Sequence, residues 1–435
     1  MKTESEAERR TAIHLLRSGK MPKEVANDVG YSPAWVRKWR QRFQEAGWEG
    51  LQSRSRAPKH SPQQLPERVR QAIRRVRSEL EAEARQPGKL SYVGSHAIRA
   101  RLQRKRIRPL PSISSIEREL RSAGMTRPWK PKQADEIQYP HIHPSHPHQL
   151  TQVDIFPKYL TGGQSVACFN AIDVVSRYPG GKQYTTKRAE DAMDFLVYVW
   201  QMLGLSTYTQ VDNEGCFSGG FTHPYVLGQV LRLGLYVGTE LIFSPFYHPE
   251  SNGTVERFHQ EHDRNVWAKI TLSNLAAVQA HSAHFFDEYR QSQHHSALQG
   301  RSPAELHLAA AFPRLPMDFK IPGKLPLTVG RVHFIRLANT TRQVLLLNTS
   351  WNVPRAHEEQ GLWATLEFSL QGARLFVFDQ APDVRKRTCL AVHPFPLKEP
   401  VVPLQTQFGK LSALTRQRWW QAATSAGAHP PATMS

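Results

Sequence analysis

The alternation of apolar and polar residues predicts a run of short helices at the start of the chain. Over residues 5–45, apolar side chains recur at the three- and four-residue spacing of a helix that packs one face against a core. Gly30 interrupts this pattern, and Ser32 followed by Pro33 is a typical helix start. Two helices are therefore expected on either side of a tight turn, Pro22–Val29 and Ser32–Phe43.

These two helices have the outline of a helix-turn-helix. Ala26 is small enough to let two helices approach, Gly30 opens the turn, and Val36 and Trp39 anchor the second helix on the first. The exposed face of the second helix then carries four side chains able to meet phosphates or base edges, namely Arg37, Lys38, Arg40 and Gln41. An ordinary helical hairpin with a solvated basic face is the alternative. We assign residues 1–52 to a DNA-binding domain.

A second helical segment follows a Ser- and Pro-rich linker at residues 53–64. Ser114 and Glu117 fit a capping box, and Gly124 fits the helix stop. Residues 65–131 are therefore predicted to form a second helix-turn-helix-like domain, with a helical spacer as the alternative. Its expected helices are Pro66–Ala84, Tyr92–Arg104 and Ser114–Ser122. Its basic strip supplies three candidate DNA contacts, Arg104, Lys105 and Arg106.

The pattern changes after a Pro- and His-rich linker at residues 132–149. Over residues 150–310, three short apolar runs bounded by turn signals precede alternating helical and strand-like segments. This order indicates an α/β domain with a mixed sheet flanked by helices. The expected strands are Leu150–Phe156, Ser165–Ile172, Gly181–Thr186, Ser206–Val211 and Leu235–Phe243. The expected helices are Lys187–Leu203, Pro224–Leu233, Thr254–Lys269 and Asn274–Gln291.

Residues 318–400 return to short strands and predict a small C-terminal β barrel. Its expected strands are Leu327–Arg336, Gln343–Leu347, Thr365–Leu370, Arg374–Asp379 and Cys389–Val392. Residues 401–435, which include Trp419 and Trp420, are assigned to a tail. The chain is therefore expected to be multidomain, with all-α N-terminal domains, an α/β core and a β barrel.

The positive charge of the chain and its distribution indicate what kind of partner the protein binds. The chain has 57 Lys and Arg against 37 Asp and Glu, a formal net charge of +20. Residues 1–131 hold 30 of the basic and 13 of the acidic side chains, so most of the excess lies in the helical domains. This distribution favours a polyanion over an acidic membrane surface, since no stretch approaches the roughly 20 apolar residues that span a bilayer. We expect a nucleic-acid partner and no membrane.

The cysteines and the N-terminus point to a reducing compartment. The three cysteines, Cys168, Cys216 and Cys389, lie far apart and form no C-x-x-C pair, which argues against a disulfide framework or a cysteine-based zinc site. Met1–Arg10 is charged and lacks the apolar core of a signal peptide. A cytoplasmic setting is therefore expected.

Three acidic residues lie where the predicted strands and helices would place a metal site. Asp154 sits within an apolar strand, Asp212 ends another, and Glu256 begins a helix after a Pro-, Asn- and Gly-containing loop. A carboxylate within an apolar strand needs a partner, because burying it alone is costly. Two Mg²⁺ ions would supply one, since Mg²⁺ prefers oxygen ligands and such a pair promotes phosphodiester chemistry. All three are predicted catalytic residues and metal ligands.

Around these acids the chain resembles a DDE transposase of the retroviral-integrase-like superfamily, and specifically bacterial insertion-sequence transposases with N-terminal helix-turn-helix units. The matching segments are Val153–Asp154, Val211–Phe217, Pro249–His259 and Glu288–Leu306. The resemblance implies an RNase H-like core, two Mg²⁺ ions with Mn²⁺ as a substitute, cleavage at transposon ends and transfer of those ends into target DNA. It also implies a homo-oligomer in the bacterial cytoplasm, associated with the nucleoid. The need for an ATPase partner stays open.

The chain departs from the family pattern at two points. Forty-three residues separate Asp212 from Glu256, whereas the family spacing is about 35, and a loop insertion would absorb the difference at little cost. The DNA-contacting lysine that often follows the glutamate is absent, and Arg257 or Arg264 is the expected substitute. Asn252 is a further candidate DNA contact.

Two other functions remain open from the sequence. A domesticated transposase that has lost catalysis would act as a DNA-binding regulator. A nuclease of RNase H type would share the metal chemistry but only hydrolyse DNA. The intact trio of acids argues against the first, and two upstream DNA-binding units argue against the second.

Overall fold

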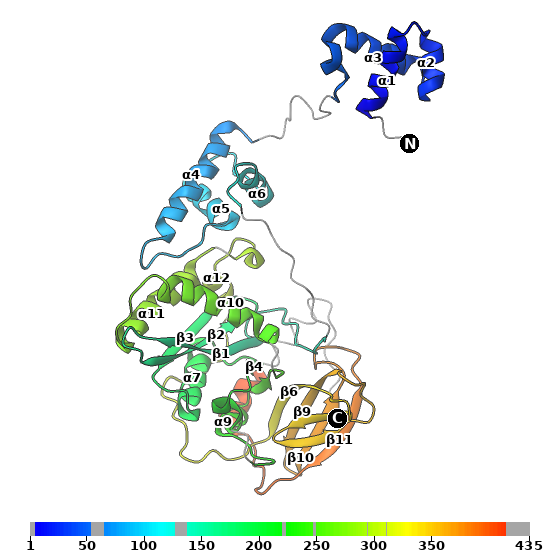
Figure 1. Ribbon diagram of the computed structural model, residues 1–435. Helices are drawn as coiled ribbons and strands as arrows, with labels where there is room; N and C mark the ends of the chain where they lie inside the picture. The colour runs from blue at the N-terminus through cyan, green and yellow to red at the C-terminus, as the bar shows by residue number, and fades with distance from the viewer. Residues whose placement is uncertain are drawn as a thin grey trace. The chain divides into compact units, whose positions relative to one another are not determined.

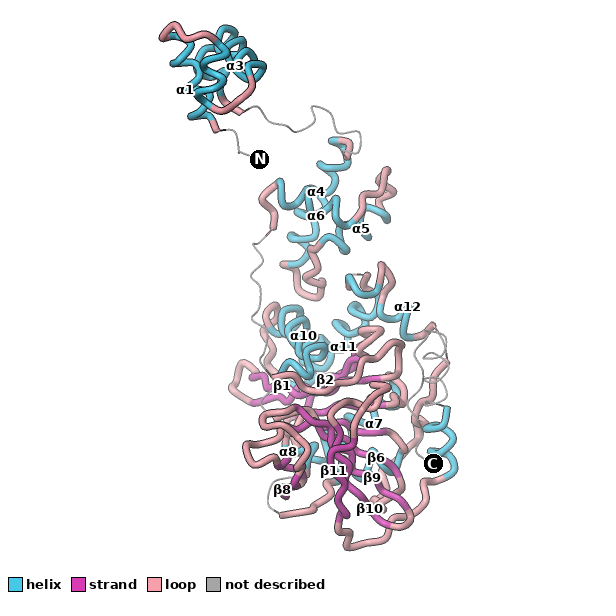
Figure 2. Tube along the Cα trace, turned by 90° about the vertical axis from the view of Figure 1, so that its right-hand side faces the viewer, coloured by secondary structure: helices cyan, strands magenta, loops and turns pink. Residues whose placement is uncertain are grey.

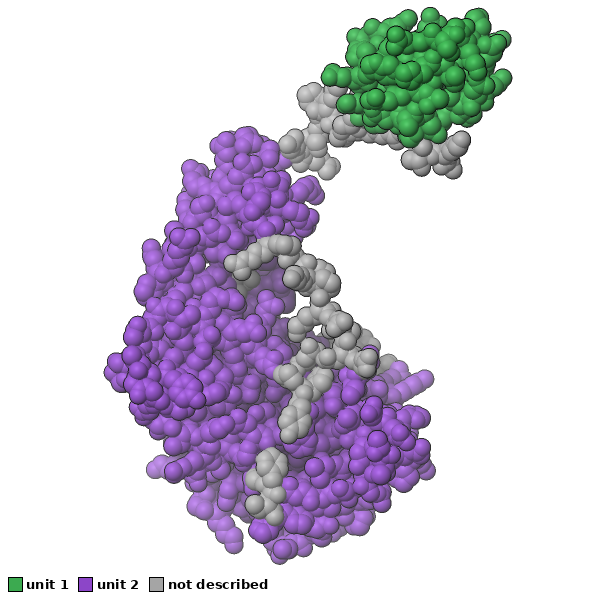
Figure 3. Space-filling model, viewed as in Figure 1, with its two compact units in different colours: residues 1–64 green, residues 65–435 purple. Residues whose placement is uncertain are grey.

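The computed structural model describes residues 5–53, 65–126, 137–219, 223–246, 249–293, 295–309 and 311–414. The chain divides into two compact units, residues 1–64 and 65–435 (Figure 3). Within the described ranges, no helix combines the length and the apolar character needed to cross a bilayer. Residues 54–64, most of the first predicted linker, lie outside the described residues, as do Trp419 and Trp420.

The first unit is a helix-turn-helix, as predicted. Ser5 and Glu8 form a capping box at its start. Gly30 ends the second helix with φ +75°, a left-handed conformation that suits glycine, and Ser32 caps the third. The predicted anchors Ala26, Val36 and Trp39 are all buried. Its elements are α1 (Glu6–Arg17), α2 (Pro22–Val29), α3 (Pro33–Ala46) and the 3₁₀ helix η1 (Gly47–Leu51).

The second unit begins with three helices that share a small apolar core (Figure 1). They are α4 (Glu67–Ala84), α5 (Ser95–Arg104) and α6 (Ile113–Ser122). The predicted capping box of Ser114 and Glu117 is wrong. Ser112 caps α6 instead, because its hydroxyl accepts from the Ser115 amide at 3.2 Å, while Glu117 accepts from Ser95. The helix therefore starts one residue before Ser114.

A mixed sheet of nine strands forms the body of the second unit, in the order β11-β10-β9-β6-β5-β4-β1-β2-β3. β1, β2 and β3 pair antiparallel, whereas β1 with β4, β4 with β5, and β5 with β6 pair parallel. The strands of the predicted α/β domain are β1 (Leu150–Tyr159), β2 (Ser165–Asp173), β3 (Pro179–Tyr184), β4 (Tyr208–Val211) and β5 (Glu240–Phe243).

Helices cover both faces of this sheet, because its central strands are apolar on both sides. On β2, Phe169 and Ala171 pack with α7 and α9, while Cys168 and Ile172 pack with α10 and α11. Figures 1 and 2 both show α10 and α11 on the side of β1 and β2 opposite α7. The helices are α7 (Ala189–Met202), α8 (Gly215–Ser218), α9 (Gln229–Val237), η2 (Pro249–Asn252), α10 (Gly253–His262), the π-helical turn η3 (Asp263–Trp267), α11 (Leu275–Gln291), η4 (Ser296–Leu298) and α12 (Pro303–His307).

One predicted strand is partly helical. Leu235–Val237 closes α9 rather than opening the strand expected at Leu235–Phe243, and β5 begins only at Glu240. Gly238 separates the two elements, since its φ of +77° ends the helix in a left-handed turn.

The C-terminal strands continue the core sheet. β6 pairs with β5 over Leu241–Phe243 and covers what would otherwise be an open sheet edge. The predicted closed barrel is not confirmed, because the hydrogen-bonded order runs without a break from β5 into β6, β9, β10 and β11. The strands are β6 (Gly330–Leu337), β7 (Gln343–Leu346), β8 (Thr349–Asn352), β9 (Gly361–Ser369), β10 (Gly372–Phe378) and β11 (Cys389–Phe395), with β7 and β8 forming a separate hairpin.

The segment assigned to a tail is ordered at its start. Residues 406–414 are helical, and Phe408 is buried against Tyr236 and Phe319, with ring centroids 5.2 and 5.8 Å away. This part of the tail therefore belongs to the core of the second unit.

Candidate active site

Asp154 and Asp212 each end a copy of the same tetrapeptide. Thr-Gln-Val-Asp occurs at residues 151–154 on β1 and again at residues 209–212, at the end of β4. The strands are parallel neighbours, and their register pairs Gln152 with Gln210. Asp154 and Asp212 each follow their glutamine by two residues, so they emerge at equivalent positions at the same end of the sheet.

The paired glutamines hold the loop that leads to Glu256. Both are buried, and the side-chain amides of both donate to the Ser251 carbonyl, at 3.0 and 3.1 Å. The Gln152 side-chain oxygen accepts from the Thr254 amide at 3.2 Å. These bonds fasten the start of α10 to β1 and β4, and Glu256 lies in the first turn of that helix.

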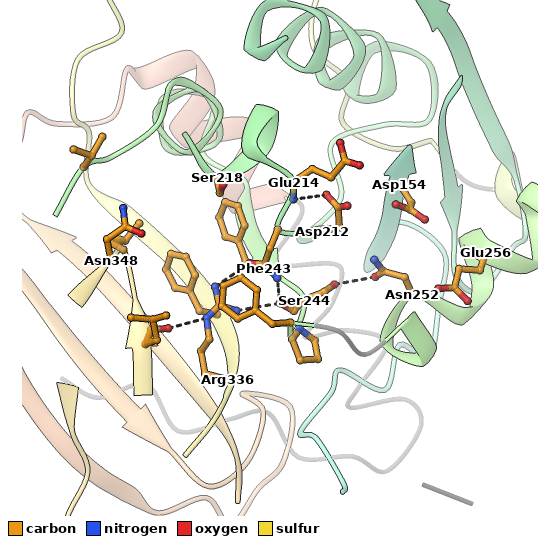
Figure 4. Close-up of a pocket in the computed structure, with 17 residues that line it drawn as sticks. Asp154, Asp212, Glu214, Ser218, Phe243, Ser244, Asn252, Glu256, Arg336 and Asn348 are labelled. Carbon is orange, nitrogen blue, oxygen red and sulfur yellow. Dashed lines mark hydrogen bonds between the residues drawn. The ribbon is translucent and has the colours of Figure 1, made fainter. Parts of the chain in front are cut away.

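Asn252 completes this network. Its side-chain oxygen accepts from Gln210 at 2.9 Å. It also accepts from the Ser244 hydroxyl at 3.0 Å (Figure 4). The residue is only 5% exposed. Asn252 therefore helps to hold the loop that leads to Glu256, and its predicted contact with DNA stays a prediction.

The three predicted catalytic acids line a single cavity of about 800 Å³ (Figure 4). Burial and, to a smaller extent, the nearby charges of Asp212 and Glu256 together raise the pKa of Asp154 to about 7. Burial also raises the pKa of Asp212 to about 6, with a contribution from Glu214. Acids that are held together and away from water in this way are destabilised as anions, and a bound cation would relieve that cost.

The donor set fits a hard divalent cation. The acidic groups offer only oxygen ligands, as Mg²⁺ prefers. His259 lies beside them, with Nδ1 3.5 Å from Asp154 Oδ2, and burial lowers the pKa of His259 to about 3. Its ring is therefore neutral and adds no positive charge that would compete with a cation.

Two further acids near the trio have other partners. Glu214 lines the cavity but forms an ion pair with Lys187 at 2.9 Å. Asp173 accepts from the Ser176 amide at 2.7 Å and from the His148 amide at 2.6 Å, so it caps the turn that follows β2. Asp173, His148 and His307 cluster closely enough to suggest a metal site. However, the ring nitrogens of both histidines already have protein partners, because those of His148 face carbonyl oxygens at 3.2 and 3.0 Å and those of His307 face the Ser176 hydroxyl and the Leu203 carbonyl, each at 2.9 Å. We interpret this cluster as structural.

Comparison with known families agrees with this geometry. A family described as "Winged helix-turn helix" matches residues 9–77, and one described as "Integrase core domain" matches residues 237–303, which include Glu256. Residues 237–303 thus resemble an integrase core domain. Together with the helix-turn-helix, this confirms the resemblance to DDE transposases that the sequence motifs indicated.

The solved structures to which this chain is similar include integrases of viruses. The simian T-cell lymphotropic virus intasome in complex with the PP2A regulatory subunit B56 gamma matches at 14% identity and a TM-score of 0.33, covering 69% of this chain and 96% of that one. The HTLV-2 integrase catalytic core in complex with magnesium matches at 14% identity and a TM-score of 0.29, covering 37% and 97%. The BIV integrase core gives 16% identity, a TM-score of 0.28, and coverage of 36% and 93%. Scores this low carry no further argument.

The predicted DNA contacts outside the integrase core differ in availability. On α3, all four are exposed, and Gln41 donates to Glu45 at 2.9 Å. Near the end of α5, Arg104 and Arg106 are exposed, whereas Lys105 pairs with Glu79 at 2.6 Å.

Two arginines follow Glu256 in the core. Arg257 is exposed and adjoins Glu256 in the sequence, and Arg264 pairs with Glu261 at 3.0 Å. Both arginines are exposed, and both stay predicted substitutes for the missing lysine.

Sequence reasoning missed the residues that support the integrase site. The signal for Gln152 and Gln210 was present, because the tetrapeptide repeats. Arg336 of β6 gave no such signal. It is buried, and its guanidinium donates to the Asn213 side chain at 2.9 Å and to the Ser244 carbonyl at 3.0 Å. Only the pairing of β6 with β5 brings it to the loop that follows Asp212.

Proposed function

We propose that this chain is a DNA transposase that binds transposon ends, cuts them and joins them to target DNA. One observation carries the proposal. Asp154, Asp212 and Glu256 come from three separate segments, yet they line one cavity in which burial raises the pKa of both aspartates, and the charges of Asp212 and Glu256 add to the rise at Asp154. Such an arrangement favours a cation-dependent reaction of an anionic substrate, and the integrase core match supports a polynucleotide as that substrate.

The carboxylates of Asp154, Asp212 and Glu256 would hold two Mg²⁺ ions, with Mn²⁺ as a substitute. Two ions in such a site activate the attacking oxygen and stabilise the leaving oxygen of a phosphodiester. Gln152 and Gln210 orient the site by fixing the start of α10 against both aspartate-bearing strands. The exposed Arg257, on the same helix as Glu256, would bind the donor DNA backbone.

The helical segments would recognise the DNA. Arg37, Lys38, Arg40 and Gln41 on α3 form the proposed reading surface of the first unit, and the net charge of +20 suits a polyanionic partner. We propose residues 1–52 and 65–131 as DNA-binding domains and residues 150–310 as the catalytic domain. The protein would act as a homo-oligomer that holds two ends together, in the bacterial cytoplasm at the nucleoid.

A strand-transfer assay tests the proposal. The substrate is a labelled duplex that carries an end of the element encoding this chain, mixed with Mg²⁺ and a plain target plasmid. We expect joined product from the native chain and none from Glu256→Gln, with equal DNA binding by both. Binding without product from the native chain would favour the regulator, and cleavage without joining would favour the nuclease.

A further inference from the structure

The cavity that contains the acids has a second, apolar half. Figure 4 shows Phe243, Arg336 and Asn348 on the side away from Asp154 and Glu256. Metal ions bind to oxygen ligands and phosphates bind to positive charge, and neither needs apolar side chains. The chemistry at the acids therefore does not explain an apolar wall in the same cavity. The apolar residues that line it are Val226, Phe243, Phe246, Phe334, Leu345 and Leu347.

This wall combines a fixed aromatic base with an exposed apolar edge. Phe243 and Phe334 stack with centroids 4.9 Å apart and planes 10° from parallel, and both are buried. Leu345 is 52% exposed and Val226 is 41% exposed. Large apolar side chains left in water beside a pocket are typical of a surface that a ligand covers.

A buried cation lies against the same wall. The Arg336 guanidinium lies 4.5 Å from the Phe246 ring centroid and 5.2 Å from that of Phe334. It donates to neutral acceptors, and no described carboxylate forms an ion pair with it. Its positive charge is therefore uncompensated next to the cavity, where it would attract an anionic ligand.

A polar group of the cavity has no hydrogen-bond partner among the described residues. The Ser218 hydroxyl oxygen is buried and has no hydrogen bond to any described residue, although Ser218 lines the cavity. A buried hydroxyl without a partner costs free energy, which a ligand with polar edge atoms would recover. The aromatic wall, the Ser218 hydroxyl and the Arg336 cation together suit a ligand with flat apolar faces, polar atoms at its edge and an attached anion.

We propose that this apolar half receives an unstacked nucleobase of the DNA whose phosphodiester lies at the carboxylates. A base matches each feature, because it has apolar faces for the aromatic wall, polar edge atoms and a phosphate on either side. The phosphate bound at the acids would bring the neighbouring base to the apolar wall. This inference rests on the proposed function for the identity of the DNA, but base binding is measured without any reaction.

The test compares a paired with an unpaired base. The full chain is titrated, with Mg²⁺ present, with a short duplex that lacks a transposon end and contains 2-aminopurine either opposite thymine or as a single-base bulge. We expect the native chain to bind the bulged duplex about 10-fold more tightly and to quench its emission by stacking. Leu345→Ser and Phe246→Ala should reduce this preference to less than about 2-fold. Leu370→Ser is the matched control, because Leu370 is 60% exposed and does not line the cavity.

Three results would overturn the inference that a base binds at the apolar wall. A native chain without preference for the bulge overturns the inference, as does an unchanged preference in both Leu345→Ser and Phe246→Ala. Loss of preference in Leu370→Ser as well would show a non-specific effect and also overturn it. The strand-transfer assay reports separately on the proposed function. Joined product without base preference rejects only the base site, and base preference without joined product rejects only the transposase.

Discussion

Like charges gather in two regions of this chain, the carboxylate cavity of the second unit and the basic face of α3 in the first. The acids are withdrawn from water, and Asp154 retains 18% side-chain exposure. The cations of α3 are exposed. Burial raises the free energy of the ionised carboxylates, and binding a metal cation would lower it again. The solvated arginine and lysine side chains of α3 instead attract DNA phosphates over a distance. The first region is suited to chemistry and the second to recognition.

The second helical segment differs from both regions. Its basic residues are numerous, but many are already neutralised. Arg70 and Arg74 share Glu119, Arg101 pairs with Glu83, and Lys105 pairs with Glu79. The number of basic residues in this segment therefore overstates the cations that it offers to DNA.

The largest expected effect separates chemistry from recognition. Asp154→Asn, Asp212→Asn and Glu256→Gln should each reduce joined product by at least about 10²-fold, because each removes a charged ligand from the cavity. End binding, measured by gel shift, should be unchanged, since these acids belong to the second unit and the proposed reading surface to the first. Native-like joining in any one variant would remove that residue from the site.

The next effect concerns the glutamines. Gln210→Ala should lower joining by about 10–100-fold, since the loop before Glu256 loses its anchor. Gln152→Glu keeps the acceptor for the Thr254 amide and should retain more activity than Gln152→Ala. Joining rates compared at matched thermal stability give the measurement, and equal rates for Gln152→Glu and Gln152→Ala would contradict the assigned hydrogen bond.

Burial of the acids also predicts a pH-dependent stability. The pKa of Asp154 is about 7 in the folded chain against an ordinary value of 3.8, so the folded state holds a proton that the unfolded state releases. Stability should therefore fall as pH rises from about 4 to about 7. Asp154→Asn should be more stable than the native chain by about 1–3 kcal/mol at pH 8 without divalent ions. Urea unfolding measures this difference, which should disappear near pH 4.

The smallest effects separate the two basic regions. Arg37→Ala or Lys38→Ala should weaken DNA binding by about 5–10-fold and reduce the slope of log K against log salt by about 1. Lys105→Ala should change binding by less than about 2-fold, because Glu79 already neutralises that charge. Fluorescence anisotropy across a salt series gives both values, and a larger loss for Lys105→Ala would reverse the assignment of the reading surface.

Local patterns predicted much of this molecule. The helix-turn-helix followed from Gly30, Ser32 and the spacing of Val36 and Trp39, because turn chemistry and helical periodicity act over a few residues. The motifs around Asp154, Asp212 and Glu256 also proposed the site, and the structure brings all three into one cavity. Boundaries were less certain, as at Gly238, where one residue divides a helix from a strand.

The sequence by itself determined which acids could hold cations and which helix could read DNA, since those properties lie in short motifs. The tertiary structure alone decided what surrounds them. Strand pairing joins residues far apart in the chain, so the match of Gln152 with Gln210 and the arrival of Arg336 beside Asn213 depend on the sheet order. The same pairing extends the core sheet through β6 and sets an apolar wall against the acids, which no local pattern could specify.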